Sequence, residues 1–577
     1  MATLPVFSVH AGRETDVDVD RLTRDVLGGR DLTAESRGPA TTIRGPEVHL
    51  DVDRGRGGVW AGDLSRLWDP SPTKIPGVGA VAEIATEAME RVHLIPELGR
   101  QFRLTKGEVR QATTVTERAG KRSTRKGEST FGRDVVVDIS DRDDIVGDSI
   151  PMFGGGGRFR ATVGEGGQVV GAHGVWRDAD AVDERPLLTQ AQALQRAGIS
   201  TRRKDVKITG STLGYYSAPA FSGQELMFPV YAVTADVLDG DRWVPSRVRL
   251  IPATDVGEIG VPEHETPPRA EAKDFTDLRH LVVPGQVLPS TLTVSTAVLE
   301  RNGVRASDLL TRGPSGNVFV KPQLDLSLYP LIWEALRPRS FGASWIGEMG
   351  GLGGSQANAQ GFVDEMTAEG WSRRFNWGNE AAWKSDWLSN DDNYVDDVDI
   401  VFYTGHASPD GWMLASGGSS DWLHSSDVGP WQGSPSDHWG QENLEWAIVA
   451  ACGPLEDDAI NGGGSVFSRW SGAFDGLHML LGYAAVTYDN TEEGRRFASY
   501  ARSGMTLKQA WFRTAQEIQP ATNGYGDPYG PDVYAGAMYL GSASGSTGGD
   551  HLWGHGSVGP DIRGTSSTYR ACHWSPC

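Results

Sequence analysis

The chain has 577 residues, of which 38% are hydrophobic and 22% are charged, and its formal net charge is −21. This length exceeds what one hydrophobic core supports, so we expect two to four domains with the composition of a folded protein. The negative charge argues against a nucleic-acid binder, and the absence of any apolar run of about 18 residues argues against a membrane span.

The first residues lack a basic stretch followed by an apolar one, which predicts a cytoplasmic protein. Secretion stays open if a leader was removed. Cysteine is scarce, so the chain is no disulfide scaffold. Cys572 and Cys577 lie close enough in sequence to pair, which would leave Cys452 as the odd thiol.

Residues 1–255 mix short helices and strands and predict an α+β region that serves as a prodomain or docking module. Apolar spacing predicts helices over 80–91 and 189–197. Alternating residues predict a hairpin over 158–175 and strands over 230–234 and 243–251.

A basic cluster interrupts this region: it consists of Arg118, Lys121, Arg122, Arg125 and Lys126. The simplest interpretation is a solvated loop, and the alternatives are a docking site for an acidic partner or a cleavage site. Residues 256–335 are predicted to form a linker, centred on 263–269, and a β-rich bridge.

From residue 336 onward, apolar runs of strand length alternate with helical patterns. The predicted strands are 341–346, 398–404, 446–451 and 476–486, and the predicted helices are 355–368, 491–502 and 506–517. This alternation is typical of α/β domains with a mostly parallel sheet covered on both faces. Residues 336–577 are therefore predicted to form one such domain.

Two of these strands end in reactive side chains. His406 follows the strand 398–404, and Cys452 follows the strand 446–451. Functional groups in open α/β sheets gather beyond the carboxyl ends of the strands. Neighbouring parallel strands would therefore bring a thiol and a general base to the same edge.

This layout resembles the clan of cysteine peptidases that includes caspases, legumains and gingipains, which carry His-Gly after one strand and Ala-Cys or Gly-Cys after the next. The fuller set of motifs, at 403–407, 450–454 and 553–557, is similar to the bacterial family of unknown function DUF6345 and spans residues 336–577. The resemblance implies a caspase-like three-layer α/β/α domain. Ala407 departs from the clan, which usually has Gly after the His.

The resemblance also implies a hydrolase: a cysteine endopeptidase acting on a protein or peptide substrate, activated by a partner or by self-processing. Cys452 would be the nucleophile and His406 the general base and acid, while the backbone N–H groups of Ala407 and Cys452 would hold the oxyanion. The alternative is a catalytically silent structural or binding protein on the same fold. A third interpretation is a sugar-binding surface built from the 19 tryptophans.

The sequence signals for substrate specificity and for metal binding are weaker than those for the strands and the His–Cys pair. Asp489, Glu492 and Glu493 could line a pocket for a basic side chain, although an acidic first helical turn explains them more simply. The acidic run Asp391 to Asp399 could bind Ca²⁺, but it lacks the Gly and terminal Glu of an EF-hand loop. The histidines lack the spacing of metal ligands, so neither metal nor cofactor is otherwise expected.

Overall fold

The structure is a computed structural model of the chain. It describes residues 2–10, 17–29, 32, 34–45, 47–70, 74–140, 145, 147–200, 203–262, 264, 285, 287–289, 292–295, 298–299, 302–312, 318–321, 326–328, 331–332, 335–428, 439–525, 530–543, 545–562 and 567–577. Within these ranges, none of the helices has the length and apolar character needed to cross a bilayer.

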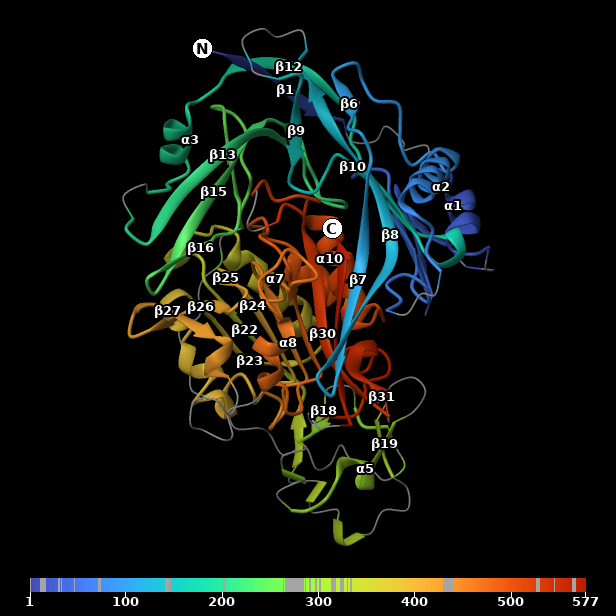
Figure 1. The fold of residues 1–577 in the computed structure, drawn as a ribbon, viewed down its shortest axis with the longest axis vertical. Coiled ribbons are helices and arrows are strands. Elements are labelled where there is room, and N and C mark those ends of the chain that lie inside the picture. The colour runs from blue at the N-terminus through green and yellow to red at the C-terminus, as the bar shows by residue number, and fades with distance from the viewer. Residues whose placement is uncertain are drawn as a thin grey trace.

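The fold is mixed α/β and rich in strands, and one large mixed sheet runs through most of the molecule (Figure 1). Its C-terminal part begins with five parallel strands and continues with two antiparallel ones. In spatial order these are β23 (Ser372–Gly378), β22 (Ser340–Trp345), β24 (Ile400–Thr404), β28 (Trp446–Ala450), β29 (Met479–Tyr483), β30 (Tyr534–Ser542) and β32 (Tyr569–Pro576).

Three helices predicted from the sequence pack together against one face of these strands: α7 (Ser355–Ala368), α9 (Glu493–Arg502) and α10 (Leu507–Ile518). Helix α10 begins where the periodicity predicted, because Thr506 and Gln509 form a reciprocal capping box. Phe362 of α7 stacks on Phe402 of β24, with ring centroids 5.1 Å apart.

The opposite face is covered differently from the predicted second helical layer. It carries the small sheet β25 (Ala407–Ser408), β26 (Gly411–Ser416) and β27 (Ser419–His424), short 3₁₀ segments and the five-residue helix α8 (Val466–Trp470). The coarse α/β prediction is confirmed. The predicted parallel pairing is found among the first five strands of the C-terminal domain, whereas the sheet as a whole is mixed.

Buried tryptophans fill this second face. Trp387, Trp412, Trp439 and Trp470 are fully buried and contact one another, and the rings of Trp412 and Trp470 stack at 5.1 Å. Among the tryptophans that the structure describes, only Trp243 and Trp383 are exposed. A sugar-binding row of exposed tryptophans is therefore absent from the described part of the chain.

The sheet does not stop at the C-terminal region. Strand β32 pairs antiparallel with β7, and the ladder then continues through the N-terminal region. The further strands, in order, are β7 (Glu108–Arg118), β8 (Lys121–Asp138), β10 (Arg158–Val163), β11 (Val169–Val175), β5 (Gly58–Asp63), β4 (Val48–Asp53), β3 (Ala40–Arg44) and β2 (Ala34–Arg37).

Helix α2 (Val78–Arg91) packs on this N-terminal part of the sheet, as the predicted helix over 80–91 required. The hairpin predicted over 158–175 is formed by β10 and β11 and is confirmed. The remaining described elements here are β1 (Thr3–Val9), α1 (Val19–Asp25), β6 (Phe102–Leu104), β9 (Ser149–Phe153), β12 (Ala179–Pro186) and β14 (Leu226–Met227).

A second hairpin, formed by β15 (Pro229–Asp239) and β16 (Arg242–Pro245), lies next to the C-terminal domain. Strands β13 (Val206–Tyr216) and β17 (Arg249–Pro252) also pair antiparallel with β15. The predicted helix over 189–197 is confirmed as α3 (Gln190–Arg196), with Thr189 as its N-cap. The predicted strand 243–251 is split into β16 and β17 by three residues that enter the C-terminal domain.

The basic cluster at 118–126 is not a loop. It forms the end of the β7–β8 hairpin, which turns at Ala119-Gly120 with both residues at positive φ. Most of the predicted linker at 263–269 lies outside the described residues. The bridge contributes β18 (Leu292–Val294), α5 (Ala306–Leu309), β19 (Leu310–Arg312), β20 (Val318–Val320) and β21 (Leu336–Pro338).

Candidate active site at a shared sheet edge

His406 and Cys452 follow neighbouring parallel strands in the same register. Strand β24 pairs with β28, and Thr404 lies opposite Ala450. His406 comes two residues after Thr404, and Cys452 comes two residues after Ala450. The predicted placement of both side chains at one edge of the sheet is therefore confirmed, while their catalytic role stays a prediction.

The His406 ring is fully buried and held by one hydrogen bond, with Nε2 2.7 Å from the Gly350 carbonyl oxygen. Its Nδ1 atom has no hydrogen-bond partner among the described residues. Burial lowers the pKa of His406 to about 4, so the ring is neutral at pH 7. Position 350 requires glycine, because a Cβ there would lie 2.8 Å from His406 Cδ2.

The Cys452 thiol is also buried, with 2% of the residue exposed. The Thr487 N–H donates to its sulfur at 3.4 Å, and the Thr487 hydroxyl lies 3.7 Å away. Burial raises the pKa of the thiol to about 11. Both His406 and Cys452 are described, and no hydrogen bond joins them. Burial therefore favours the neutral forms of both the Cys452 thiol and the His406 ring.

Arg247 ties the two strand ends together from the N-terminal side of the chain. Its guanidinium donates to Thr404 Oγ1 at 3.1 Å, to the Ala450 carbonyl at 2.9 Å and to the Glu493 carboxylate at 3.1 Å. Both charged side chains are fully buried. Its positive charge lowers the pKa values of His406 and Cys452, which partly offsets the effect of burial on the thiol. Sequence reasoning missed Arg247.

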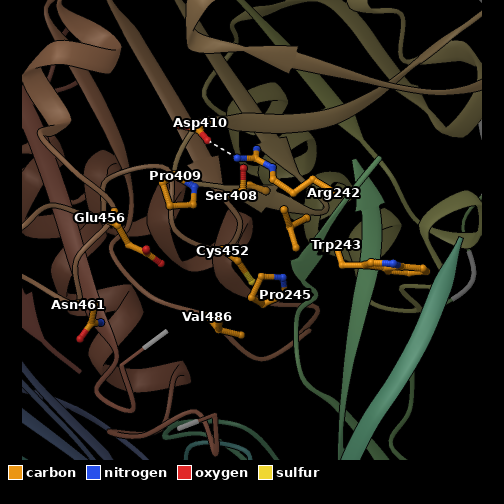
Figure 2. Close-up of a pocket in the computed structure, with 13 residues that line it drawn as sticks. Arg242, Trp243, Pro245, Ser408, Pro409, Asp410, Cys452, Glu456, Asn461 and Val486 are labelled. Atoms are coloured by element: carbon orange, nitrogen blue, oxygen red, sulfur yellow. Dashed lines mark hydrogen bonds and ion pairs between the residues drawn. The ribbon is translucent and has the colours of Figure 1, made fainter. Parts of the chain in front are cut away.

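A cavity of about 320 Å³ opens beside the thiol (Figure 2). Trp243 and Pro245 of β16 lie on one side of it, and Cys452 lies at its centre in this view. The full lining comprises Arg242, Trp243, Val244, Pro245, Ala407, Ser408, Pro409, Asp410, Cys452, Glu456, Asn461, Gly463 and Val486. The cavity thus lies between the second N-terminal hairpin and the loops that follow β24 and β28.

Glu456 gives this cavity an acidic side chain that the sequence did not single out. Burial raises its pKa to about 8, the nearby Arg469 lowers it, and Asp410 raises it further. Glu456 therefore carries a proton at neutral pH. A cationic group entering the cavity would favour the ionised form, because an opposite charge stabilises a carboxylate.

This buried carboxyl predicts a pH dependence of stability. Between pH 6 and 7.5 Glu456 is mostly protonated when folded and ionised when unfolded, so the free energy of unfolding should fall as pH rises. The slope from this group approaches about 1.4 kcal/mol per pH unit. Urea unfolding at several pH values should show a shallower slope for Glu456→Gln, whereas the exposed neighbour Asp458→Asn should leave the slope unchanged. An unaltered slope in Glu456→Gln would contradict this assignment.

The three carboxylates predicted to line a substrate pocket lie elsewhere. Glu493 is buried against Arg247, Glu492 accepts from Arg496 and Ser222, and Asp489 accepts from the Gly354 N–H at 2.9 Å. They are absent from the lining of the described cavity. Glu493 is the first residue of α9, which agrees with the alternative prediction that these acidic residues form the first turn of a helix. A pocket role for these residues stays a prediction without support from these contacts.

The carboxylates of the acidic run 391–399 mostly contact protein donors. Asp396 accepts from backbone N–H groups of Gly440 and Glu442, Asp397 pairs with Arg337, and Asp399 accepts from Ser340. Calcium binding there stays a prediction. The two C-terminal cysteines are free: Cys572 of β32 packs in one core cluster, and Cys577, which follows β32, packs in another. The sequence left open whether they pair, and in the structure they do not.

Comparison with known proteins finds a similarity in the C-terminal region. Residues 343–575 match the family described as "Domain of unknown function (DUF6345)". No curated protein matches the chain. Among solved structures, an uncharacterized protein from Eubacterium rectale ATCC 33656 aligns at 10% identity with a TM-score of 0.27, covering 45% of this chain and 87% of that one.

Proposed function

We propose that the protein is a cysteine peptidase whose active site, formed by His406 and Cys452, is held latent by its own N-terminal region. The observation that carries this proposal is the shared register of two adjacent parallel strands, each followed two residues later by the base or by the thiol. The strand order β23-β22-β24-β28-β29, ending in the antiparallel β30, supports a caspase-like core.

In the proposed reaction, the Cys452 proton passes to His406 as the sulfur attacks the carbonyl carbon of a peptide bond. The unpartnered Nδ1 of His406 is the nitrogen with a lone pair to accept it. Backbone N–H groups of Ala407 and Cys452 hold the oxyanion. Collapse breaks the C–N bond, and His406 returns its proton to the leaving amine. Water then hydrolyses the thioester.

Residues of the N-terminal region cover the Cys452 thiol, which supports the proposal that the peptidase is latent. Residues 242–249, which we call the strap, lie against the cavity from β16 and enter the C-terminal domain at Arg247. The Val248 N–H donates to the Thr487 carbonyl at 2.8 Å, next to the thiol's own contact. At the rim, Arg242 pairs with Asp410 at 2.8 Å. Activation would require this strap to shift, through a partner or through self-processing.

The second candidate is a catalytically silent protein on the same fold. Two observations favour it: burial raises the pKa of Cys452, and the ring of His406 is bonded to Gly350 instead of the thiol. The two candidates differ in what happens when the strap opens. A peptidase gains a thiolate stabilised by His406, whereas a silent protein exposes an ordinary thiol.

Alkylation of Cys452 by iodoacetamide between pH 5 and 9 tests this difference. Trp243→Ala truncates a side chain of the cavity lining and is expected to speed alkylation on the order of tenfold, equivalent to about 1.4 kcal/mol of opening free energy. In that opened background, the further change His406→Ala should raise the apparent pKa of the thiol. Identical pH profiles of alkylation with and without His406 would support the catalytically silent protein instead.

A matched control is available in the same chain. Trp383 is 42% exposed, similar to the 38% of Trp243, but it is absent from the cavity lining. Trp383→Ala should therefore leave the alkylation rate unchanged. Cys572 and Cys577 are also free and buried, so mass spectrometry of the labelled protein is needed to show that the label is on Cys452.

A further inference from the structure

A second cluster of titratable groups lies at the other end of the parallel strands. Glu445 directly precedes β28, and His478 directly precedes β29. Asp550 and Asp561 reach the same place from the C-terminal segment. Since Cys452 follows β28, this cluster and the candidate active site lie at opposite ends of one strand.

The His478 ring is fully buried and contacts a carboxylate on each side. Its Nδ1 lies 2.6 Å from Asp550 Oδ2, and its Nε2 lies 2.9 Å from Glu445 Oε2 and 3.4 Å from Asp561 Oδ1. Asp550 is itself fixed, because it accepts from the Trp446 indole at 3.1 Å and from the Gly559 N–H at 2.7 Å. The ring is therefore oriented with Nε2 toward two carboxylates.

From this arrangement we infer a binding site for a first-row divalent cation such as Zn²⁺, with His478 Nε2, Glu445 and Asp561 as ligands. The three donor atoms lie within 4.8 Å of one another. Tetrahedral zinc with bonds of about 2.0–2.1 Å separates its ligands by about 3.3 Å, close to the distances around His478 Nε2. An imidazole with two carboxylates suits zinc or manganese better than calcium, which takes oxygen ligands.

Asp550 has the role of an orienting partner in this site. Ligating histidines usually donate their other ring N–H to a carboxylate, which fixes the tautomer that leaves the ligating nitrogen bare. Exposure also differs in a consistent way: the side chains of His478 and Asp550 are buried, whereas those of Glu445 and Asp561 are 15% and 36% exposed. A cation can therefore reach the site from solvent, and water can complete its coordination.

A bound cation would join the starts of β28 and β29 to the segment 550–561. The competing explanation needs no metal: a protonated His478 ring held by the three carboxylates. Burial alone would lower the pKa of His478, but Glu445 and Asp550 raise it well above its ordinary value. The two explanations make different predictions for metal binding, which therefore decides between them.

The test is calorimetric titration of Zn²⁺ into the full chain after chelator treatment, with Mn²⁺ and Ca²⁺ in parallel. We expect one Zn²⁺ per chain and a higher melting temperature with zinc. Asp561→Asn, at a partly exposed position that should fold, is expected to weaken Zn²⁺ binding at least about tenfold, and Asp550→Asn by about 10–100-fold. The zinc-induced rise in melting temperature should also disappear in Asp561→Asn.

Glu369→Gln is the matched control, because Glu369 accepts from His555 at 2.8 Å outside this cluster. It should leave Zn²⁺ binding unchanged, and so should Cys452→Ser, which separates this site from the proposed peptidase. Failure to bind zinc or manganese stoichiometrically would overturn the inference in favour of the imidazolium. Equal zinc binding by Asp561→Asn, or a preference for Ca²⁺, would overturn it as well.

Discussion

Replacing Arg247 by Met should destabilise the protein by about 3–5 kcal/mol, the effect of leaving one partner of a buried ion pair without the other. Arg247 and Glu493 are both fully buried and 3.1 Å apart. Met keeps much of the side-chain volume, so the loss comes mainly from the uncompensated carboxylate. Urea unfolding followed by tryptophan fluorescence measures the change.

Two further variants make this prediction specific. Arg242→Met breaks the ion pairs with Asp410 and with the nearly buried Asp239. Because the Arg242 side chain is itself half exposed, the change should cost much less than Arg247→Met, about 1 kcal/mol. The double variant Arg247→Met/Glu493→Gln removes the buried charge and should recover part of the lost stability. If Arg247→Met were as mild as Arg242→Met, the guanidinium would not be holding the strand ends together.

Loss of the general base should be the largest effect on activity. In protein opened by Trp243→Ala, we expect His406→Ala to lower kcat/KM for a peptide substrate by about 10²–10⁴-fold, the contribution of a positioned acid–base residue. KM should change little, because His406 is absent from the cavity lining. Fluorogenic peptide libraries supply the assay.

His555→Ala is the natural control, because Gly554-His555 repeats the Gly-His sequence of the candidate site. Its ring lies against Glu369. This variant should keep full kcat/KM, and Cys452→Ala should have none. Hydrolysis that survives in Cys452→Ala would assign the activity to another site or to a contaminant.

The local pattern predicted the elements of the C-terminal domain well. Helix α7 has the predicted bounds of 355–368, and β24 ends at the predicted Thr404, whereas β28 ends at Ala450, one residue before its predicted end. Their parallel pairing followed from alternation of strands and helices. The spacing of Trp383 and Trp387, four residues apart, predicts a helix with both rings in the core. This prediction is wrong: the chain forms the 3₁₀ turn Lys384–Trp387 there, with Trp387 in the core and Trp383 exposed.

Contacts between distant segments could not be predicted. Arg247 lies in a short polar interruption of an apolar stretch and gives no sign of its partner Glu493, 246 residues later. The cluster around His478 escaped detection for the same reason, because its donors come from three separate segments. Spacing rules detect ligands on one element, whereas these residues meet only when β28, β29 and the C-terminal segment are assembled.

The pairing of β7 with β32 constrains the order of folding, because the two strands lie far apart in the sequence. Arg118 of β7 pairs with Tyr569 of β32, which is 451 residues further along the chain (569 − 118). At about 5–20 residues per second, the β7 edge stays without its partner for roughly 20–90 s after it leaves the ribosome. Open strand edges attract other chains, and clustered positive charge discourages this. The basic cluster lies at the end of the β7–β8 hairpin, where its charge disfavours pairing of this edge with other chains before β32 is made.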